Sequence, residues 1–298
     1  MTVGRLEDDF SKNEIAKRCE AALHLADAVG VFPTPLDHIL DRAGAGQIVD
    51  IGDIPQKVKL AKPKLLKRLL GAVIYRESTV FVDLAQRGSR ALWTKGHETT
   101  HFILPWHEAS AIHLDDNERL FGDSAEQLEI EANYGAAQLI FQGHRAMQEA
   151  LDYRHGLAVP LMLAERTGAS IHASIRYYVE HHPDPMALAT TGRRRSGEHL
   201  PIYLLTHSAS WPQQFSRPDQ VFGQQQLKVK SGPFAELLSA PKNGDDIRIA
   251  DKRLRDLRGD LRPIAIETFD NHYNKFFLIR MRGRVELGRR LQAVTKLA

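Results

Sequence analysis

Two histidines four residues apart, with a glutamate directly after the first, constrain this chain more than any other feature. They are His97, Glu98 and His101 in the segment "TKGHETTHFILPWHEA", residues 94–109. The segment is expected to be helical as far as Pro105, a residue that ends or bends a helix. Residues four apart lie on one face of a helix, so the two imidazoles can bind the same metal ion. The sequence therefore predicts a helix with a metal-binding face.

The pattern of these residues, HExxH, is typical of zinc peptidases. Glu98 lies about 100° around the helix from His97, beside the metal rather than on it. From there it can hold and deprotonate a water molecule on the zinc ion, which lowers the pKa of that water to roughly 7. A chance histidine pair on a surface helix is the alternative. A preceding β-hairpin and apolar neighbours such as Trp93 and Phe102, which can bury the rest of the helix, favour the metal site.

A catalytic zinc site needs a third protein ligand, and one candidate is His107. It lies six residues after His101, which is the count of the metzincin pattern HExxHxxGxxH. The glycine that lets the chain turn in that pattern is Leu104 here, and Pro105 follows it.

The other candidate is Glu129, in a second expected helix over about 125–141. Asn133 follows four residues later and faces the same way, so Glu129 would bind zinc while Asn133 hydrogen-bonds a ligand histidine. Glu126 is a weaker alternative because it lies at the start of the helix. Glu131 is expected to point elsewhere, into solvent.

Four further residues are candidates for contacts with a substrate or a transition state. His107 and His113 follow the first helix closely and could polarise a carbonyl group, although loop histidines without a role are the simpler interpretation. Tyr134 is next to Asn133 but is expected to pack in the core. Arg90, seven residues before the first histidine, could anchor a carboxylate.

At these two segments, "SRALWTKGHETTHFIL" and "EIEANYGAAQLI", the chain resembles the ImmA/IrrE-like zinc metallopeptidases. Members of that family have an arginine shortly before HExxH, where Arg90 stands here. They then have a glutamate, two residues and Ala-Asn, which Glu129, Ala132 and Asn133 match. The resemblance covers roughly 12–190 and implies a cytoplasmic protease that cleaves a regulator, such as a repressor, in a stress or mobile-element circuit.

Two positions depart from the family. Thr99-Thr100 stands where the family often has Leu-Gly inside HExxH, and Ile140-Phe141 stands where the second motif often ends in Met-Pro. Neither change removes a ligand, so the prediction of zinc binding is unaffected.

The composition is that of an ordinary globular protein. The chain has 298 residues, 43% of them hydrophobic, a formal net charge of +3 and a calculated pI near 8.9. It shows no leader-like start and no long apolar run, so a cytoplasmic protein without a membrane span is expected. Its single cysteine, Cys19, excludes an internal disulfide and is expected to lie in the core.

The expected fold is α+β in three regions. Residues 1–150 would form a helical, zincin-like peptidase domain with a small β-hairpin, built from strands over 71–76 and 78–83. Residues 151–192 would hold a helix-turn-helix-like pair, and 193–298 a mixed α/β region of unknown role. Within the last region, three strands are expected: "PIYLLTH", "RPIAIETF" and "NKFFLIRMR", the last two paired across a turn near Asp270–Asn271.

The predicted function is that of a zinc-dependent endopeptidase acting on a cytoplasmic regulatory protein. Zn²⁺ would be held by His97, His101 and Glu129, with Glu98 as the general base. The alternative is a regulatory protein that binds DNA or a regulator, with zinc structural or vestigial. Nucleic-acid contacts are weakly indicated. The leucines of the basic segment 57–70 favour an amphipathic helix with a solvated basic face, and the arginines at 193–195 are not interleaved with aromatic residues.

Overall fold

The computed structural model describes residues 6–54, 70–86, 88–109, 123–192, 199–223, 226–228 and 247–282, together with residues 234 and 237. Most of the basic segment 57–70, His113 and the arginines at 193–195 lie outside these residues.

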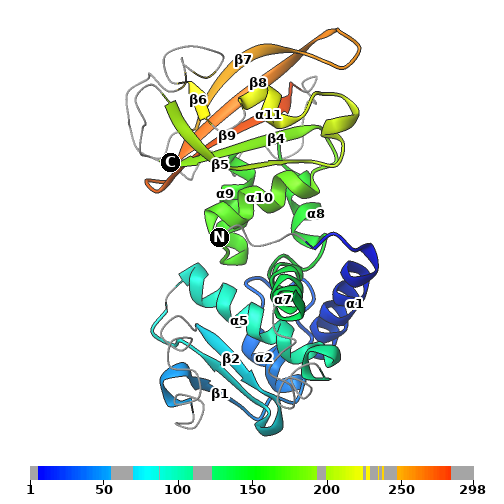
Figure 1. The fold of residues 1–298 in the computed structure, drawn as a ribbon, viewed down its shortest axis with the longest axis vertical. Helices are drawn as coiled ribbons and strands as arrows, with labels where there is room; N and C mark the ends of the chain where they lie inside the picture. Colours follow the sequence, from blue (N-terminus) through cyan, green and yellow to red (C-terminus); the bar gives the residue numbers. More distant parts are fainter. Residues whose placement is uncertain are drawn as a thin grey trace. The chain divides into compact units, whose positions relative to one another are not determined.

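The chain divides into two compact units, which are described separately. Unit 1 comprises Met1–Ala146 and Arg166–Ser170, and unit 2 comprises Met147–Glu165 and Ile171–Ala298. Both contain helices and strands, so the expected α+β class is confirmed (Figure 1). No helix in the described ranges has the length and apolar character needed to cross a membrane.

The described helices of unit 1 include α1 (Asp9–Leu25), α2 (Leu36–Arg42), α5 (Gly88–Ile103) and α7 (Asp123–Phe141). In α1 the buried residues Ile15, Cys19 and Leu23 recur every four positions and form one face. They pack with Leu36 of α2 and Leu139 of α7 in a common core. Cys19 is buried there, as the sequence predicts.

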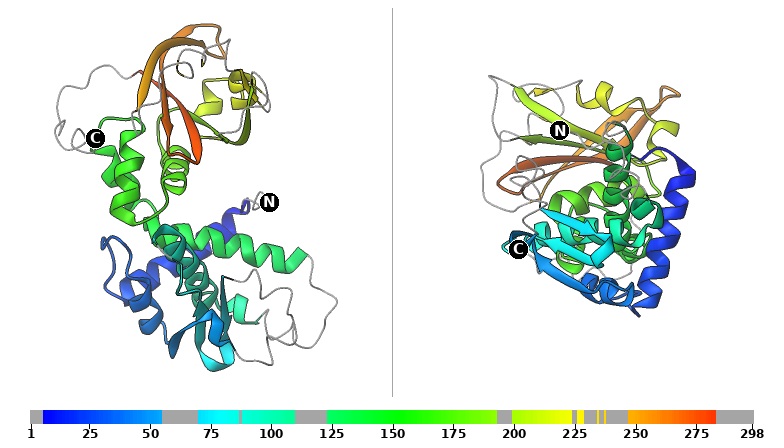
Figure 2. Two further views of the ribbon diagram at one scale, coloured as in Figure 1. Left: turned by 90° about the vertical axis from the view of Figure 1, so that its left-hand side faces the viewer. Right: turned by 60° about the horizontal axis from the view of Figure 1, so that its bottom comes forward.

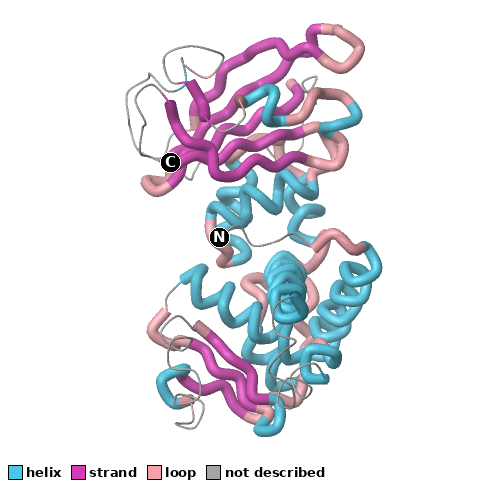
Figure 3. The backbone as a smooth tube through the Cα atoms, viewed as in Figure 1, coloured by secondary structure: helices cyan, strands magenta, loops and turns pink. Residues whose placement is uncertain are grey.

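The strands of unit 1 form a small three-stranded sheet in the order β1-β3-β2. The strands are β1 (Gln47–Asp50), β2 (Gly71–Ile74) and β3 (Thr79–Val82), and the short 3-10 turns Ile51–Asp53 and Tyr75–Glu77 follow β1 and β2. The predicted hairpin is confirmed, because β2 and β3 pair antiparallel. The sheet packs against α5, and β2 is its edge strand (Figures 1 and 3).

Unit 2 contains a six-stranded antiparallel sheet in the order β6-β5-β4-β9-β8-β7. Its strands are β4 (Met186–Gly192), β5 (His199–His207), β6 (Gln226–Lys228), β7 (Arg248–Arg255), β8 (Leu261–Asp270) and β9 (Asn274–Met281). The predicted strands correspond to β5, β8 and β9, and the last two pair across the predicted turn, with Asp270 opposite Lys275. The sequence did not reveal β4 and β7.

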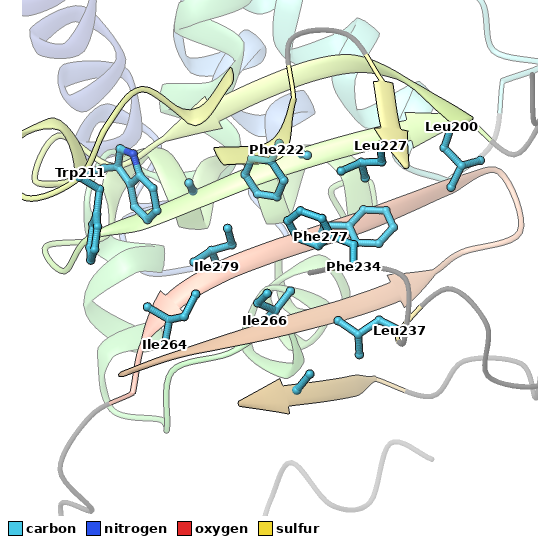
Figure 4. Packing of buried hydrophobic residues seen from close by; sticks show 14 residues of the cluster. Leu200, Trp211, Phe222, Leu227, Phe234, Leu237, Ile264, Ile266, Phe277 and Ile279 are labelled. Atoms are coloured by element: carbon cyan, nitrogen blue, oxygen red, sulfur yellow. The ribbon is translucent and has the colours of Figure 1, made fainter. Parts of the chain in front are cut away.

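The helices of unit 2 include α8 (Arg145–Leu151), α9 (Ala158–Thr167), α10 (Ile171–His181) and the short α11 (Pro218–Phe222), with a 3-10 turn at Trp211–Gln213. Both α10 and α11 pack against the neighbouring strands β4 and β5. One core cluster joins α11 and the sheet through large apolar side chains, among them Trp211, Phe222, Phe277 and Ile279 (Figure 4).

The three regions predicted from the sequence differ from these two units. The predicted boundary at residue 150 lies close to the division after Ala146. The predicted boundary at 192/193 is not a division between units, because β4 ends at Gly192 and pairs on one side with β5 and on the other with β9. Of the two helices before it, α10 packs against β4 and β5 of this sheet.

Candidate metal centre

Three side chains of unit 1 bring one potential ligand atom each to a common point. His97 and His101 come from α5, and Glu129 comes from α7. The Nε2 atoms of the two histidines are 3.1 Å apart, and the Glu129 oxygens lie 3.2 Å from Nε2 of His97 and 3.6 Å from Nε2 of His101. Ligand atoms at about 2.0–2.1 Å from a tetrahedral zinc ion are about 3.3 Å apart. The 3.2 Å contact is made by Oε2 of Glu129 and the 3.6 Å contact by Oε1, and all three separations are close to the spacing of ligands around one tetrahedral ion.

Close packing of the helices α5 and α7 makes this meeting possible (Figure 2). Gly135 of α7 lies against Thr100, so that a side chain at 135 would collide with the threonine methyl and hydroxyl groups. Thr99 and Thr100 are fully buried, and their hydroxyls donate to the carbonyl oxygens of Lys95 and Gly96. The helix therefore accommodates both threonines, and the face that carries His97 and His101 is unchanged.

Asn133 contacts the Nδ1 side of the His97 ring, opposite the nitrogen that faces Glu129. Its amide nitrogen donates to the carbonyl oxygen of Glu129 at 2.8 Å, which leaves its Oδ1 facing Nδ1 of His97 at 3.2 Å. Nδ1 of His97 therefore donates, and its Nε2 keeps the lone pair that a metal requires. The structure thus brings Asn133 to the contact that the sequence indicated.

His107 contacts the Nδ1 side of the His101 ring, a role that the sequence did not suggest. The two Nδ1 atoms are 2.8 Å apart, and Nε2 of His107 lies 3.2 Å from Oε2 of Glu131. Both nitrogens of His107 are therefore engaged away from the three ligand atoms. The structure brings Glu129, and not His107, to the two histidine Nε2 atoms, which disfavours the metzincin interpretation.

The expectation that Glu131 is solvated was wrong. Only 7% of the residue is exposed, and its carboxylate also accepts from the indole of Trp106 at 2.7 Å and from the amide of Gln127 at 3.0 Å. The reason is the short helical stretch over 105–109, which places Trp106 and His107 over that side of α7. The contact between His107 and Glu131 joins residues 24 positions apart, so no local sequence pattern predicts it. A Trp-His pair directly after a helix-ending proline is the only signal in the sequence.

Charge is concentrated at the three ligand atoms. The neighbouring imidazoles of His101 and His97 hold the pKa of the Glu129 carboxyl group far below its usual range, although 60% of its side chain is exposed. Burial alone would lower the pKa of His97, but Glu129 and Glu98 outweigh this and raise it, whereas burial lowers the pKa of His101. Glu129 is thus an anion facing two nitrogen donors, which is a ligand set suited to a divalent cation.

Glu98 lies beside the three potential ligands and is buried from solvent. Only 7% of it is exposed, and burial raises the pKa of its carboxyl group to about 7. A methyl group on Gly71 of the edge strand β2 would lie 2.5 Å from a Glu98 oxygen. Only glycine therefore lets this strand approach the carboxylate so closely.

The other predicted contact residues lie away from this point. Tyr134 packs in the core formed with α1, as expected, and Arg90 is exposed in the first turn of α5. Glu126 is exposed and is not among the residues that the structure brings to the ligand atoms. One unpredicted neighbour is Tyr75, whose hydroxyl donates to the carbonyl oxygen of His101 at 3.1 Å.

A second group of potential ligands, His155, His182 and Asp184, lies in unit 2. Nδ1 of His155 is 3.1 Å from the Asp184 carboxylate, and the backbone N–H of Asp184 donates to Nδ1 of His182 at 3.0 Å. His182 is 2% exposed, and its Nε2 has no hydrogen-bond partner within the described part of the chain.

Comparisons with known proteins support the fold alone. A solved structure described as a "Mycobacterium tuberculosis transcriptional regulator" is similar, with a TM-score of 0.51 and 12% sequence identity. The match covers 90% of this chain and 76% of that one. No protein-family model and no curated protein matches the sequence.

Proposed function

We propose that this protein is a zinc-dependent endopeptidase whose site is built by α5 and α7. The observation that carries the proposal is the convergence of three ligand atoms, from His97, His101 and Glu129, at tetrahedral spacing. Two imidazoles and one carboxylate are the ligand set of the thermolysin type of catalytic zinc site, in which the fourth position is left for a reactant. The carboxylate of Glu98 next to these ligands extends the likeness from a metal site to a catalytic one.

Zinc, when bound, supplies Lewis acidity that polarises a carbonyl group and makes water more acidic. The chain supplies the rest. The buried Glu98 carboxylate is placed to accept a proton from the attacking water and to pass it to the leaving amine. Asn133 and His107 keep both histidine rings turned with Nε2 toward the metal. The helix α5 packed on a sheet in which β2 is an edge strand among the described residues supports a zincin-like core.

The edge strand β2 is the natural place for a peptide substrate. An extended peptide can add to an exposed sheet edge through main-chain hydrogen bonds, and Gly71 brings this strand against Glu98. Binding of this kind depends on the main chain of the peptide rather than on its side chains. An unfolded or loop segment of a regulatory protein, the substrate that the family resemblance implies, has a backbone available for this pairing.

Glu98→Gln tests the proposal. The change keeps the shape of the side chain but removes the base, so peptide hydrolysis should fall by about 10²–10⁴-fold while zinc remains bound. The measurement is cleavage of a peptide library by the zinc-loaded full chain, read by mass spectrometry, with zinc content measured in the same sample. Glu108→Gln is the matched control, because Glu108 is an exposed carboxylate close by. Hydrolysis by pure Glu98→Gln at the wild-type rate would refute the mechanism.

A second candidate is a regulatory protein that binds DNA or another regulator through α9 and α10. The description of the structural neighbour and the presence of two successive helices favour it. Against it, α10 packs on β4 and β5, and its only arginine, Arg176, is paired with Glu180. Tight, salt-sensitive DNA binding without proteolysis would favour this function over the first.

A further inference from the structure

The buried chain of hydrogen bonds behind His101 has no part in binding a metal directly. It runs from Nδ1 of His101 to Nδ1 of His107, and from Nε2 of His107 to the Glu131 carboxylate. Trp106 and Gln127 then donate to the two oxygens of that carboxylate. Every polar atom of the His107 and Glu131 side chains therefore has a partner.

The donor and acceptor in each of these hydrogen bonds can be assigned by starting from Trp106 and Gln127. An indole and an amide nitrogen can only donate, so the oxygens of Glu131 act as acceptors. Nε2 of His107 must then carry the hydrogen, which leaves Nδ1 of His107 as an acceptor. His101 must in turn donate from Nδ1, and its Nε2 is the atom with the free lone pair.

We propose that Glu131 and His107 are positioning residues that fix His101 in the tautomer and ring orientation required for zinc, and thereby set the affinity of the metal site. The inference rests on the proposed function, because it concerns the same site. It goes beyond that function by assigning a role to two residues outside the three ligands and the base.

Burial supports a role beyond simple packing. His107 is 1% exposed and Glu131 is 7% exposed, although polar groups of this kind are costly to remove from water. An apolar pair would connect the stretch 105–109 to α7 at lower cost. The polar pair adds the control of a proton position on His101, and partners of this kind typically change metal affinity by roughly 10–100-fold when lost.

Two variants of one residue separate positioning from packing. In His107→Gln the amide oxygen can accept from His101 while the amide nitrogen donates to Glu131. In His107→Leu the volume is largely kept, but both hydrogen bonds are lost. The readouts are the zinc dissociation constant, from competition with a chelator, and the His101 tautomer in the metal-free full chain, from ¹⁵N chemical shifts of the imidazole.

We expect His107→Leu to weaken zinc binding about 10–100-fold and to release His101 into a mixture of tautomers. His107→Gln should stay within about threefold of the wild type and keep the Nδ1–H tautomer. Glu131→Gln, which keeps the side-chain shape, should fall between these two and covers the case in which His107→Leu does not fold. His182→Leu is the matched control, a buried histidine removed from unit 2, and should change neither readout.

Two outcomes would overturn the inference. One is wild-type zinc affinity and wild-type tautomer in both His107→Leu and Glu131→Gln, which would leave the proposed function intact. The other is an equal loss in His107→Gln and His107→Leu with a matching loss of helicity, which would make His107 a packing residue. If the wild type itself binds no zinc but its His101 tautomer still depends on His107, the proposed function fails and the positioning role stands.

Discussion

Each unit of this protein contains two histidines and one carboxylate within reach of one another, yet the two clusters differ in where the hydrogens lie. In unit 1 the outer nitrogens of His97 and His101 donate to neighbours, so both inner nitrogens, which lie next to Glu129, keep the lone pairs that a metal ion requires. In unit 2 the lone pair on Nδ1 of His182 already accepts a backbone N–H, and neutral His182 therefore carries its hydrogen on Nε2. The same residue types thus present three potential metal ligands in one place and pair with one another in the other, and the groups behind the rings decide which.

Removal of one carboxylate from each cluster is the strongest way to break this comparison. Glu129→Ala takes away a ligand, so zinc affinity should fall by more than the roughly 100-fold that loss of an outer partner costs. Asp184→Ala should leave zinc affinity unchanged. Chelator competition on both variants measures this directly, and equal losses would show that the second cluster also holds zinc.

Two glycines offer a second contrast, since each lies against a glutamate. A methyl group at Gly71 would meet Glu98 at 2.5 Å, and one at Gly156 would meet both Glu267 carboxylate oxygens at 2.8 Å. Gly71→Ala should misplace the base and lower hydrolysis about 100-fold with zinc retained.

Gly156→Ala should instead destabilise unit 2 by about 3 kcal/mol, because its φ of +153° adds backbone strain to the collision, and should leave zinc binding unaffected. Peptide cleavage and urea unfolding distinguish the two effects. A Gly71→Ala variant with full activity would show that β2 can shift to make room for the methyl group without moving Glu98.

The cluster in unit 2 should also make the stability of the folded chain depend on pH. Burial lowers the pKa of His182 to about 4, below an unfolded value of roughly 6.5. Between these values the unfolded chain binds the extra proton and the folded chain does not, so stability falls as the pH is lowered from about 6.5 to about 4. The loss amounts to about 3 kcal/mol at most.

Hydrogen exchange of β4 and β9 amides in the full chain, followed from pH 7 to pH 4, measures this loss in unit 2. The matched variant is His182→Phe, which should flatten the dependence. An unchanged slope in that variant would assign the acid sensitivity to other groups.

The smallest contrast concerns two tyrosine hydroxyls. Tyr178 is fully buried and accepts from the backbone N–H of Gly156, so Tyr178→Phe leaves a buried donor without its partner and should cost about 1–3 kcal/mol. The Tyr75 hydroxyl donates to the carbonyl oxygen of His101 in a partly buried position, and Tyr75→Phe should cost about 1 kcal/mol or less. Urea midpoints of the two variants provide the measurement, and a larger loss for Tyr75 would reverse the ranking.

Local spacing predicted the parts of the site that lie on one helix face. His97 with His101, and Glu129 with Asn133, are pairs four residues apart, and helix geometry alone places each pair together. The contact between Glu131 and His107 was missed because it joins separate elements, and the prediction for Glu131 assumed that the far side of α7 faces water.

The fold was predictable to the same extent. Strands with apolar or aromatic runs, such as β8 and β9, were found from composition. β4 was missed because its small residues are buried almost throughout and show no alternation, and β7 because five of its eight residues are charged. Both gain their strand character from paired neighbours in the sheet, which a single segment does not reveal.

The origin of the ligands on two helices has a consequence for the lifetime of unit 1. A cation held by His101 and Glu129 joins parts of the chain separated by roughly thirty residues, and a cross-link of that span restricts the unfolded chain by an amount worth about 3–4 kcal/mol. With Cys19 as its single cysteine, the chain has no internal disulfide to provide such a cross-link. Zinc supply would then govern how long unit 1 persists against unfolding and turnover, as well as whether it can cut a peptide.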